Sequence, residues 1–242
     1  MPLHAALSDR TLRLELDEPE RGNAFGRSTA RALAAALRLH DGRFEDVVLS
    51  ASGRFFCTGG DLADHAKMTD AREGRAANRE IAAVLDLLAA VPRPTLAVIQ
   101  GDCLGGGLEL ASCFDRVVTV PEAAFGFWQR RMGLSFGWGG GARLGRRLTP
   151  HLLRRLATEA VTLTAHEALA IGLVDRIVLA ARLEEDVADW IARLRAWPGA
   201  LGRRSGKGFL QSERIVFESL WWGPEHRARL SKRASSGLRP AE

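Results

Sequence analysis

The stretch FFCTGGDL, residues 55–62, places two aromatic side chains directly before a pair of glycines and an aspartate. Two adjacent apolar aromatics are typical of a short buried strand. The glycines that follow permit either a tight turn or a close approach of a backbone N–H group to a ligand oxygen. Residues further along the chain decide between these two interpretations.

A second glycine cluster lies in the stretch GDCLGGGLELASCFD, residues 101–115. We expect a strand to end at Gly101 and a helix to begin within the triplet Gly105–Gly107. Helix N-termini carry unpaired N–H groups, which glycine leaves accessible to a ligand atom. Close packing of the helix on the strand is the alternative explanation. Neither cluster matches a nucleotide-binding loop, and two such turns together favour an oxyanion hole.

Composition and charge narrow the class of protein. The chain has 242 residues, 46% of them hydrophobic, which suits one soluble domain with or without a small appendage. It contains no apolar run of membrane-spanning length and no secretory signal, so we expect a cytoplasmic protein without a membrane partner. The net charge of +5 accompanies no nucleic-acid-binding motif, and we expect no nucleic-acid partner.

The three cysteines, Cys57, Cys103 and Cys113, lack the spacing of a metal site or of a disulfide framework. We therefore expect them to be small buried side chains, and we predict no metal site.

Strand-like and helix-like segments alternate in the first half of the chain, which favours α/β layers with parallel strands. Periodicity predicts strands at 11–16, 46–50, 95–101 and 116–120, and helices at 28–40 and 81–91. Residues 63–79 are polar with few packing side chains, which is typical of a mobile lid.

The second half of the chain is predicted to be mostly helical. Thr164 and Glu167 have the spacing of a capping box, and the stretch LVDRIV (173–178) is a predicted strand. Three amphipathic helices are expected after Leu183. We accordingly predict a core at residues 1–180 and a C-terminal helical region at residues 181–242.

Five stretches resemble the enoyl-CoA hydratase/isomerase family, the crotonase superfamily, in their order and spacing. They are RGNAF (21–25), FFCTGGDL (55–62), GDCLGGGLELASCFD (101–115), FGFWQRRMGLSFGWGGGARL (125–144) and EALAIGLVDRIV (167–178). The resemblance implies an α/β fold, a crotonase-like spiral of ββα units, followed by a C-terminal helical region that forms trimers.

The same resemblance assigns expected catalytic positions. In this family the thioester oxygen of an acyl-CoA lies between two backbone N–H groups, which correspond here to Gly60 and Gly106. Glu109 takes the position of one catalytic glutamate. The second acid of the hydratases is replaced by Gln129, and glutamine neither gives nor takes a proton near neutral pH. His65 and His166 are not expected to be catalytic.

The resemblance also implies positions that contact the substrate, namely Arg21, Phe56, Thr58, Asp61 and Trp128. Arg21 lies where the family often places a basic residue near the CoA phosphates, and Asp61 is also a candidate cap of a turn or helix. The implied partner is an acyl-CoA thioester bound by a homotrimer or a dimer of trimers. No cofactor is expected, because coenzyme A is part of the substrate.

Gln129 leaves the reaction open. Decarboxylation of a malonyl-type CoA thioester is our first hypothesis, because it needs a stabilised enolate and one proton. The stretches FWQRRMGLSFGWGG (127–140) and FESLWWGPEHRARL (217–230) resemble the ethylmalonyl-CoA decarboxylase branch. The alternatives are a hydratase or isomerase acting through Glu109 and a CoA-binding protein without turnover. RNA binding, for which the family has precedent, is a further class that the basic charge permits.

Overall fold

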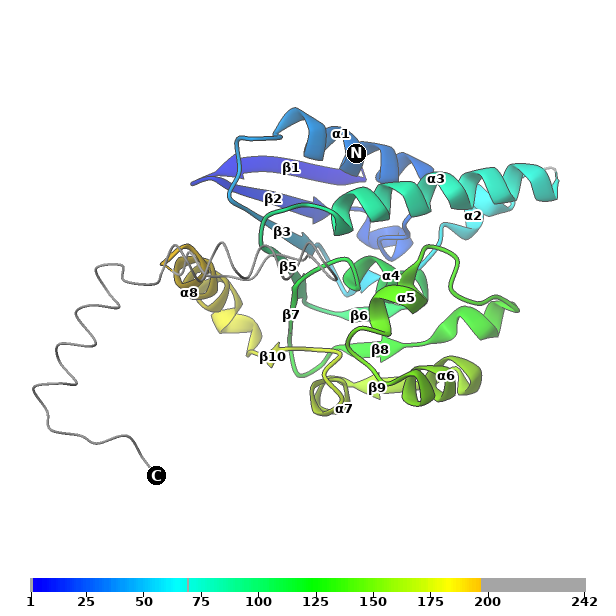
Figure 1. The fold of residues 1–242 in the computed structure, drawn as a ribbon. Helices are drawn as coiled ribbons and strands as arrows, with labels where there is room; N and C mark the ends of the chain where they lie inside the picture. Colours follow the sequence, from blue (N-terminus) through cyan, green and yellow to red (C-terminus); the bar gives the residue numbers. More distant parts are fainter. Residues whose placement is uncertain (1, 69, 197–242) are drawn as a thin grey trace, which may run out of the picture. The chain divides into compact units, whose positions relative to one another are not determined.

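A computed structural model describes residues 2–68 and 70–196 (Figure 1). The strands are β1 (Leu3–Ser8), β2 (Thr11–Leu16), β3 (Asp46–Ala51), β4 (Phe55–Cys57), β5 (Thr95–Ile99), β6 (Asp102–Leu104), β7 (Arg116–Thr119), β8 (Ala124–Gly126), β9 (Thr162–Thr164) and β10 (Arg176–Ile177). The helices are α1 (Arg27–Leu39), α2 (Leu62–His65), α3 (Ala71–Ala89), α4 (Gly106–Ala111), α5 (Gly140–Leu144), α6 (Pro150–Glu159), α7 (Ala165–Ala170) and α8 (Leu183–Ala196). Short 3-10 turns are η1 (Pro19–Arg21), η2 (Trp128–Met132) and η3 (Ala180–Arg182).

The strands of the described residues form two sheets. The larger sheet has the order β1-β2-β3-β5-β7-β10, and the smaller has the order β4-β6-β8-β9. Pairing is parallel in both sheets except between β1 and β2 and between β8 and β9. Parallel pairing requires a crossover between neighbouring strands, and those crossovers set the path of the chain.

Three successive turns of the chain follow one pattern. The turns β3–β4–α3, β5–β6–α4 and β7–β8–α5 each add one strand to the larger sheet and one to the smaller sheet before a helix. This arrangement confirms the predicted α/β spiral of ββα units.

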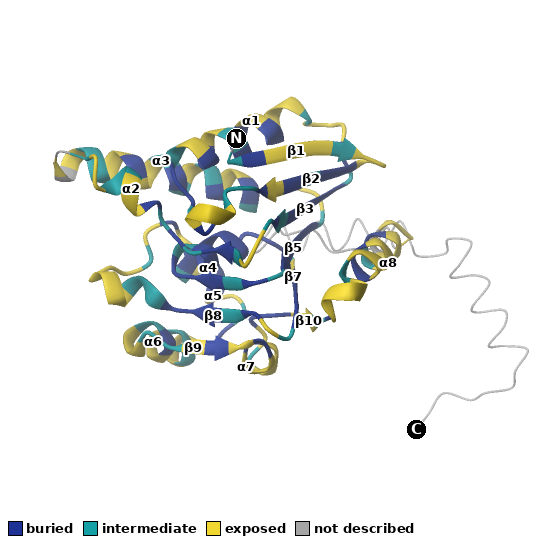
Figure 2. Cartoon of the chain, turned by 180° about the vertical axis from the view of Figure 1, so that it is seen from behind, coloured by how far each residue is buried: buried dark blue, intermediate teal, exposed yellow. Residues whose placement is uncertain are grey.

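Burial follows the same architecture (Figure 2). All five residues of β5, TLAVI, are buried, because a central parallel strand is covered on both faces. The edge strand β1 is mostly exposed, whereas β2 buries its leucines. Helices α1 and α3 lie side by side (Figure 1), each with apolar residues on the face that packs inward.

The predicted lid at residues 63–79 is largely helical instead. Asp61 caps α2, and Asp70 caps α3 by accepting hydrogen bonds from the N–H groups of Arg72 and Glu73, both at 2.8 Å. The predicted helix at 81–91 corresponds to the second half of α3. Helix α3 itself begins ten residues earlier, at Ala71. Two aspartate caps outweigh the low apolar content of this segment, because each satisfies N–H groups that a helix start leaves unpaired.

Other boundaries differ by a few residues. The predicted strand at 95–101 ends at Ile99. Of the strand predicted at 173–178, only β10 (Arg176–Ile177) is formed. The capping box is confirmed, since Thr164 and Glu167 bond reciprocally. Of the three helices predicted after Leu183, α8 is described and the other two lie outside the described residues.

Contacts divide the chain into a unit of residues 1–188 and a unit of residues 189–242. Helix α8 contains the boundary between them, and the described part of the second unit ends at residue 196. The division predicted at residue 180 stays a prediction. No helix in the described ranges has both the length and the apolar content to cross a membrane.

Asn23 holds the turn between η1 and α1 close to the segment that leads into β4. Its side chain is 2% exposed, and its φ of 52° lies in the left-handed region that asparagine tolerates. The side-chain Nδ2 donates to the carbonyls of Ser52 and Phe55 at 2.8 and 2.7 Å, and Oδ1 accepts from the Glu18 N–H at 2.8 Å. One amide therefore satisfies three partly buried backbone groups.

An Asn23→Asp substitution keeps the shape and the Oδ1 acceptor but directs a carboxylate oxygen at two carbonyls. We expect the free energy of unfolding to fall by about 2–4 kcal/mol, because buried acceptors lose their donors. Chemical denaturation measures the change. Gln100→Ala is the comparison, since it removes longer bonds to the Gly53 and Phe55 carbonyls and should cost about 1 kcal/mol. Equal stability of Asn23→Asp and the native chain would contradict this role.

Candidate active site

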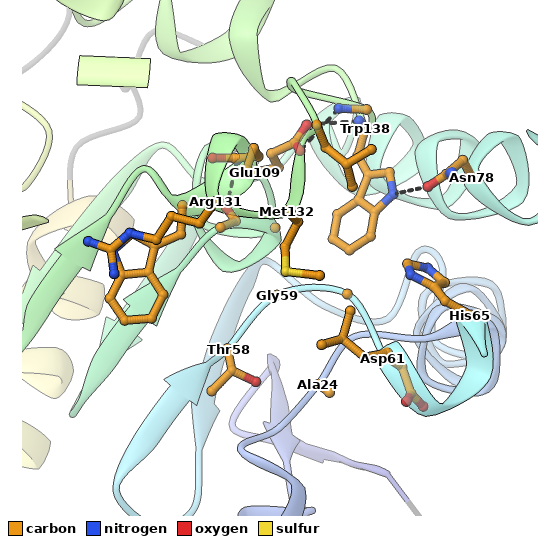
Figure 3. Close-up of a pocket in the computed structure, with 18 of the residues that line it drawn as sticks. Ala24, Thr58, Gly59, Asp61, His65, Asn78, Glu109, Arg131, Met132 and Trp138 are labelled. Atoms are coloured by element: carbon orange, nitrogen blue, oxygen red, sulfur yellow. Dashed lines mark hydrogen bonds between the residues drawn. The ribbon is translucent and has the colours of Figure 1, made fainter. Parts of the chain in front are cut away.

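A pocket of about 600 Å³ opens where the ends of β4 and β6 meet helices α2, α3 and α4 and the segment 128–138. That volume is typical of a small-molecule site. Its walls include nearly all of the residues proposed from the sequence: Arg21, Thr58, Gly60, Asp61, Gly106, Glu109, Trp128 and Gln129. Residues distant in the sequence therefore meet in one cavity, several of them shown in Figure 3.

Two glycine peptides in the pocket wall are oriented by their carbonyl oxygens. The Gly59 carbonyl accepts a hydrogen bond from the Phe25 N–H at 2.7 Å. The Gly105 carbonyl accepts from Gln129 Nε2 at 2.9 Å and from the Leu108 N–H at 3.1 Å. Because a trans peptide is planar, the N–H groups of the next residues point away from these partners.

The N–H groups so oriented belong to Gly60 and Gly106. Neither donates a hydrogen bond to a group in the described ranges. The two turns are in contact, since a Cβ atom on Gly59 would lie 3.1 Å from the Gly106 nitrogen. Gly59 also has a φ of 108°, which L side chains rarely adopt. Two adjacent unpaired donors in a pocket wall form the arrangement that binds an oxyanion.

Gln129 lines the pocket from η2, and its Nε2 fixes the Gly105 carbonyl. The amide therefore steadies the peptide that carries the Gly106 N–H group. Its Oε1 is buried and has no hydrogen-bond partner in the described part of the chain. Gln129 thus contacts the proposed oxyanion site through its hydrogen bond to the Gly105 carbonyl.

Glu109 is held by the backbone of the segment that leads into α5. The side chain is 2% exposed. Oε1 accepts from the Gly137 N–H at 3.2 Å, and Oε2 accepts from the N–H groups of Trp138 and Gly140 at 2.8 and 2.9 Å. These three bonds compensate for burying the carboxylate and set its direction. They also join α4 to α5.

The Arg21–Asp61 pair closes the opposite side of the pocket. Asp61 accepts from the Ala63 and Asp64 N–H groups at 3.0 and 3.1 Å, which confirms it as a helix cap. Arg21 Nη2 binds both Asp61 carboxylate oxygens, at 2.8 and 2.7 Å. The role of Arg21 beside CoA phosphates stays a prediction, because its described partners are acidic side chains, Glu18 as well as Asp61.

Phe56 is the expected substrate contact that the structure does not bring to the pocket. Its ring is 0% exposed and belongs to the core. The family resemblance placed it at the site. Adjacent residues of a strand point to opposite faces, and here Phe56 is the buried aromatic of β4 while Phe55 is partly exposed. Thr58, after the end of β4, does line the pocket, and its N–H donates to the Gly22 carbonyl at 3.0 Å.

Trp128 lines the pocket and is fixed on two sides. Its Nε1 donates to Thr162 Oγ1 at 2.7 Å, and the Arg131 guanidinium lies 4.1 Å from the indole centroid. That separation is a cation–π contact. The contact gives this wall an apolar surface with a positive charge beside it.

Sequence reasoning left several pocket residues unassigned to the site, among them His65, Asn78 and Trp138. His65 lies one helical turn after Asp61 on α2, a spacing that could have placed it beside that aspartate. Asn78 lies on α3, in the part of the chain that was predicted to be a lid and therefore was not assigned a helix face. Trp138 directly precedes the glycines at 139–141. A bulky aromatic beside three glycines was the available sequence signal for a pocket residue. In Figure 3 its indole reaches toward the pocket between Met132 and His65.

The three cysteines are buried thiols, as predicted. Burial raises the pKa of the Cys57 thiol to about 12, and it raises the pKa of Cys103 well above its ordinary value. A thiol without accessible thiolate is a poor nucleophile. These side chains therefore serve as packing residues of β4 and β6.

Residues 8–202 match the model of the family described as enoyl-CoA hydratase/isomerase. The chain belongs to this family. A crotonyl-CoA hydratase from Syntrophomonas wolfei is 31% identical over 186 residues, covering 75% of this chain and 70% of the relative. An ethylmalonyl-CoA decarboxylase from Mus musculus is 25% identical over 236 residues, covering 91% of this chain and 73% of the relative.

Solved structures share the fold. An enoyl-CoA hydratase/isomerase structure from Mycobacterium abscessus superposes with a TM-score of 0.82 at 26% identity, covering 98% of this chain and 97% of the other. Enoyl-CoA hydratase/isomerase family membership makes this chain an acyl-CoA enzyme, and the relatives include both hydratases and decarboxylases.

The two adjacent glycines at the start of α5 allow a matched test of the Glu109 contact. A Cβ atom on Gly140 would lie 2.3 Å from Glu109 Cγ, whereas one on Gly141 would meet the Phe136 ring at 3.0 Å. We expect Gly140→Ala to lower the free energy of unfolding by about 1–3 kcal/mol through overpacking. Gly141→Ala should change it by less than about 1 kcal/mol. Equal effects in urea denaturation would contradict the tight Glu109 contact.

Proposed function

We propose that this enoyl-CoA hydratase/isomerase family member decarboxylates a malonyl-type CoA thioester. The observation that carries the proposal is the pair of unpaired Gly60 and Gly106 N–H groups in a pocket where Gln129 replaces a second acid. Two N–H donors stabilise the negative charge that develops on a thioester oxygen. Loss of carbon dioxide requires that stabilisation and one proton, but it does not require a pair of acids.

The reaction balances with these groups. The bond between the α-carbon and the carboxylate carbon breaks, and its electron pair forms the thioester enolate. Carbon dioxide leaves, and the enolate oxygen accepts hydrogen bonds from Gly60 and Gly106. A proton then adds to the α-carbon. We assign its delivery to Glu109, either from the protonated acid or from a water molecule that the carboxylate holds.

Apolar surroundings favour this chemistry at the carboxylate end of the substrate. A strong ion pair with the departing carboxylate would stabilise the ground state and slow its loss. The indoles of Trp128 and Trp138 supply apolar pocket wall. Of the two arginines in the wall, Arg21 is bound to Asp61, and the Arg131 guanidinium lies against the face of the Trp128 indole. The similarity to ethylmalonyl-CoA decarboxylases from Mus musculus and Gallus gallus also supports the proposal.

Hydration or isomerisation of an enoyl-CoA through Glu109 is the second candidate. The similarity to a crotonyl-CoA hydratase favours it. Against it stands the Gln129 side chain, which cannot act as the second acid or base. A CoA-binding protein without turnover is the outcome that remains if neither reaction occurs.

Mass spectrometry of purified protein incubated with methylmalonyl-, ethylmalonyl- and crotonyl-CoA tests the proposal. We expect loss of carbon dioxide from a malonyl thioester and no change in crotonyl-CoA. Glu109→Gln should lower turnover by at least about 100-fold, the usual range for an acid–base group. His166→Gln, outside the pocket, is the control. Water addition to crotonyl-CoA without decarboxylation would overturn the proposal in favour of a hydratase.

Gln129→Glu tests whether a second acid at this position is what hydration requires. A carboxyl group there would face the Gly105 carbonyl, which accepts hydrogen bonds and so favours the protonated acid. We expect this variant to gain measurable crotonyl-CoA hydration if the missing acid is the obstacle. Gln129→Leu, which offers neither an acid nor a donor, is the comparison and should gain none. Equal hydration by both variants would show that a carboxyl group at this position is not the limiting feature.

A further inference from the structure

The six-membered ring of Trp138 lies across both glycines of the proposed oxyanion site. A Cβ atom on Gly106 would come within 2.4 Å of Trp138 Cζ3 and 2.7 Å of Cη2. A Cβ atom on Gly60 would lie 3.6 Å from Cζ2 of the same ring. The ring therefore contacts the two peptide turns that hold the Gly60 and Gly106 N–H groups.

Hydrogen bonds fix the Trp138 residue at several points. Its Nε1 donates to Asn78 Oδ1 at 3.0 Å, as the dashed line in Figure 3 shows, and its backbone N–H donates to Glu109. Its carbonyl accepts from Arg143, a buried side chain that also binds Asp86 at 2.9 Å. The backbone of Trp138 is thus held from α4 and α5, and its indole is held from α3 by Asn78, which limits its freedom to swing aside.

Exposure defines the two ends of the pocket. Trp138 and Glu109 are 4% and 2% exposed, whereas Leu62, Met132 and Leu134 on the same lining are more than half exposed. The charged CoA portion of a thioester has to stay near water, because burying unpaired phosphates is costly. The acyl group therefore points to the closed end, where it meets the Trp138 ring.

We propose that Trp138 restricts the acyl group to short chains. An acyl carbon chain bound with its thioester oxygen at Gly60 and Gly106 has the indole in its path, held by Asn78. This inference deepens the proposed function, since it names short malonyl-type thioesters as the substrate class. It rests on acyl-CoA binding and does not depend on which reaction follows.

Calorimetric titration with acetyl-, butyryl-, hexanoyl-, octanoyl- and decanoyl-CoA tests the proposal, because these saturated thioesters are bound without turnover. In an open pocket each buried methylene tightens binding about fourfold. We expect the native chain to gain nothing from butyryl- to octanoyl-CoA. Trp138→Ala should bind octanoyl-CoA at least about tenfold more tightly relative to butyryl-CoA.

Two further variants keep the test decisive if Trp138→Ala does not fold. Trp138→Phe shortens the ring and removes the bond to Asn78, and Asn78→Ala releases the indole. Each variant should bind octanoyl-CoA more tightly relative to butyryl-CoA than the native chain does, but by a smaller factor than Trp138→Ala. Trp190→Phe, in α8 and outside the pocket lining, is the matched control and should keep the native preference.

The outcomes separate the two proposals. Fourfold tightening per methylene in the native chain, or an unchanged preference in every folded Trp138 and Asn78 variant, would overturn the chain-length limit. Retained short-chain preference with no carbon dioxide release would remove only the decarboxylase assignment. Failure of every acyl-CoA to bind, butyryl-CoA included, would overturn both.

Discussion

The site depends on two peptide units whose carbonyl oxygens are held so that their N–H groups stay available. The Gly59 carbonyl is bound by the Phe25 N–H, and the Gly105 carbonyl by Gln129 and the start of α4. Phe25 and Gln129 come from segments remote in sequence from the glycines that they hold. The donors are therefore oriented before a ligand arrives, and no reorganisation is needed when charge develops.

The architecture places these peptides together without long loops. Successive turns of the spiral add β4 and β6 as parallel neighbours, with Cys57 opposite Cys103 in the register. The glycine turns that follow these strands must then lie at the same sheet edge. Glu109 is one helical turn further along α4, and its carboxylate organises the α5 entrance through three N–H groups. The proposed catalytic position and the local folding of α5 are thus coupled in one side chain.

The sequence predicted the spiral, which the structure confirms, because the spacing of its motifs along the chain is local information. It also named Gly60, Gly106 and Glu109, which line one pocket, while their catalytic roles stay a prediction. It misplaced Phe56, since strand register decides which of two adjacent aromatics faces the core. It missed α2 and the first half of α3, where Asp61 and Asp70 caps act in place of apolar periodicity. His65, Asn78 and Trp138 meet only through tertiary packing of α2, α3 and the segment before α5. The pocket composition could therefore not be read from any single stretch.

The buried thiols of β4 and β6 have a consequence for chemical compatibility. Enoyl thioesters are electrophiles that add thiolates at the β-carbon, and such compounds occur among the substrates of relatives of this chain. Because burial raises the pKa of Cys57 to about 12, its thiol stays protonated at neutral pH. The strands that precede Gly60 and Gly106 can thus contain cysteine and still resist alkylation by an electrophilic ligand in the pocket.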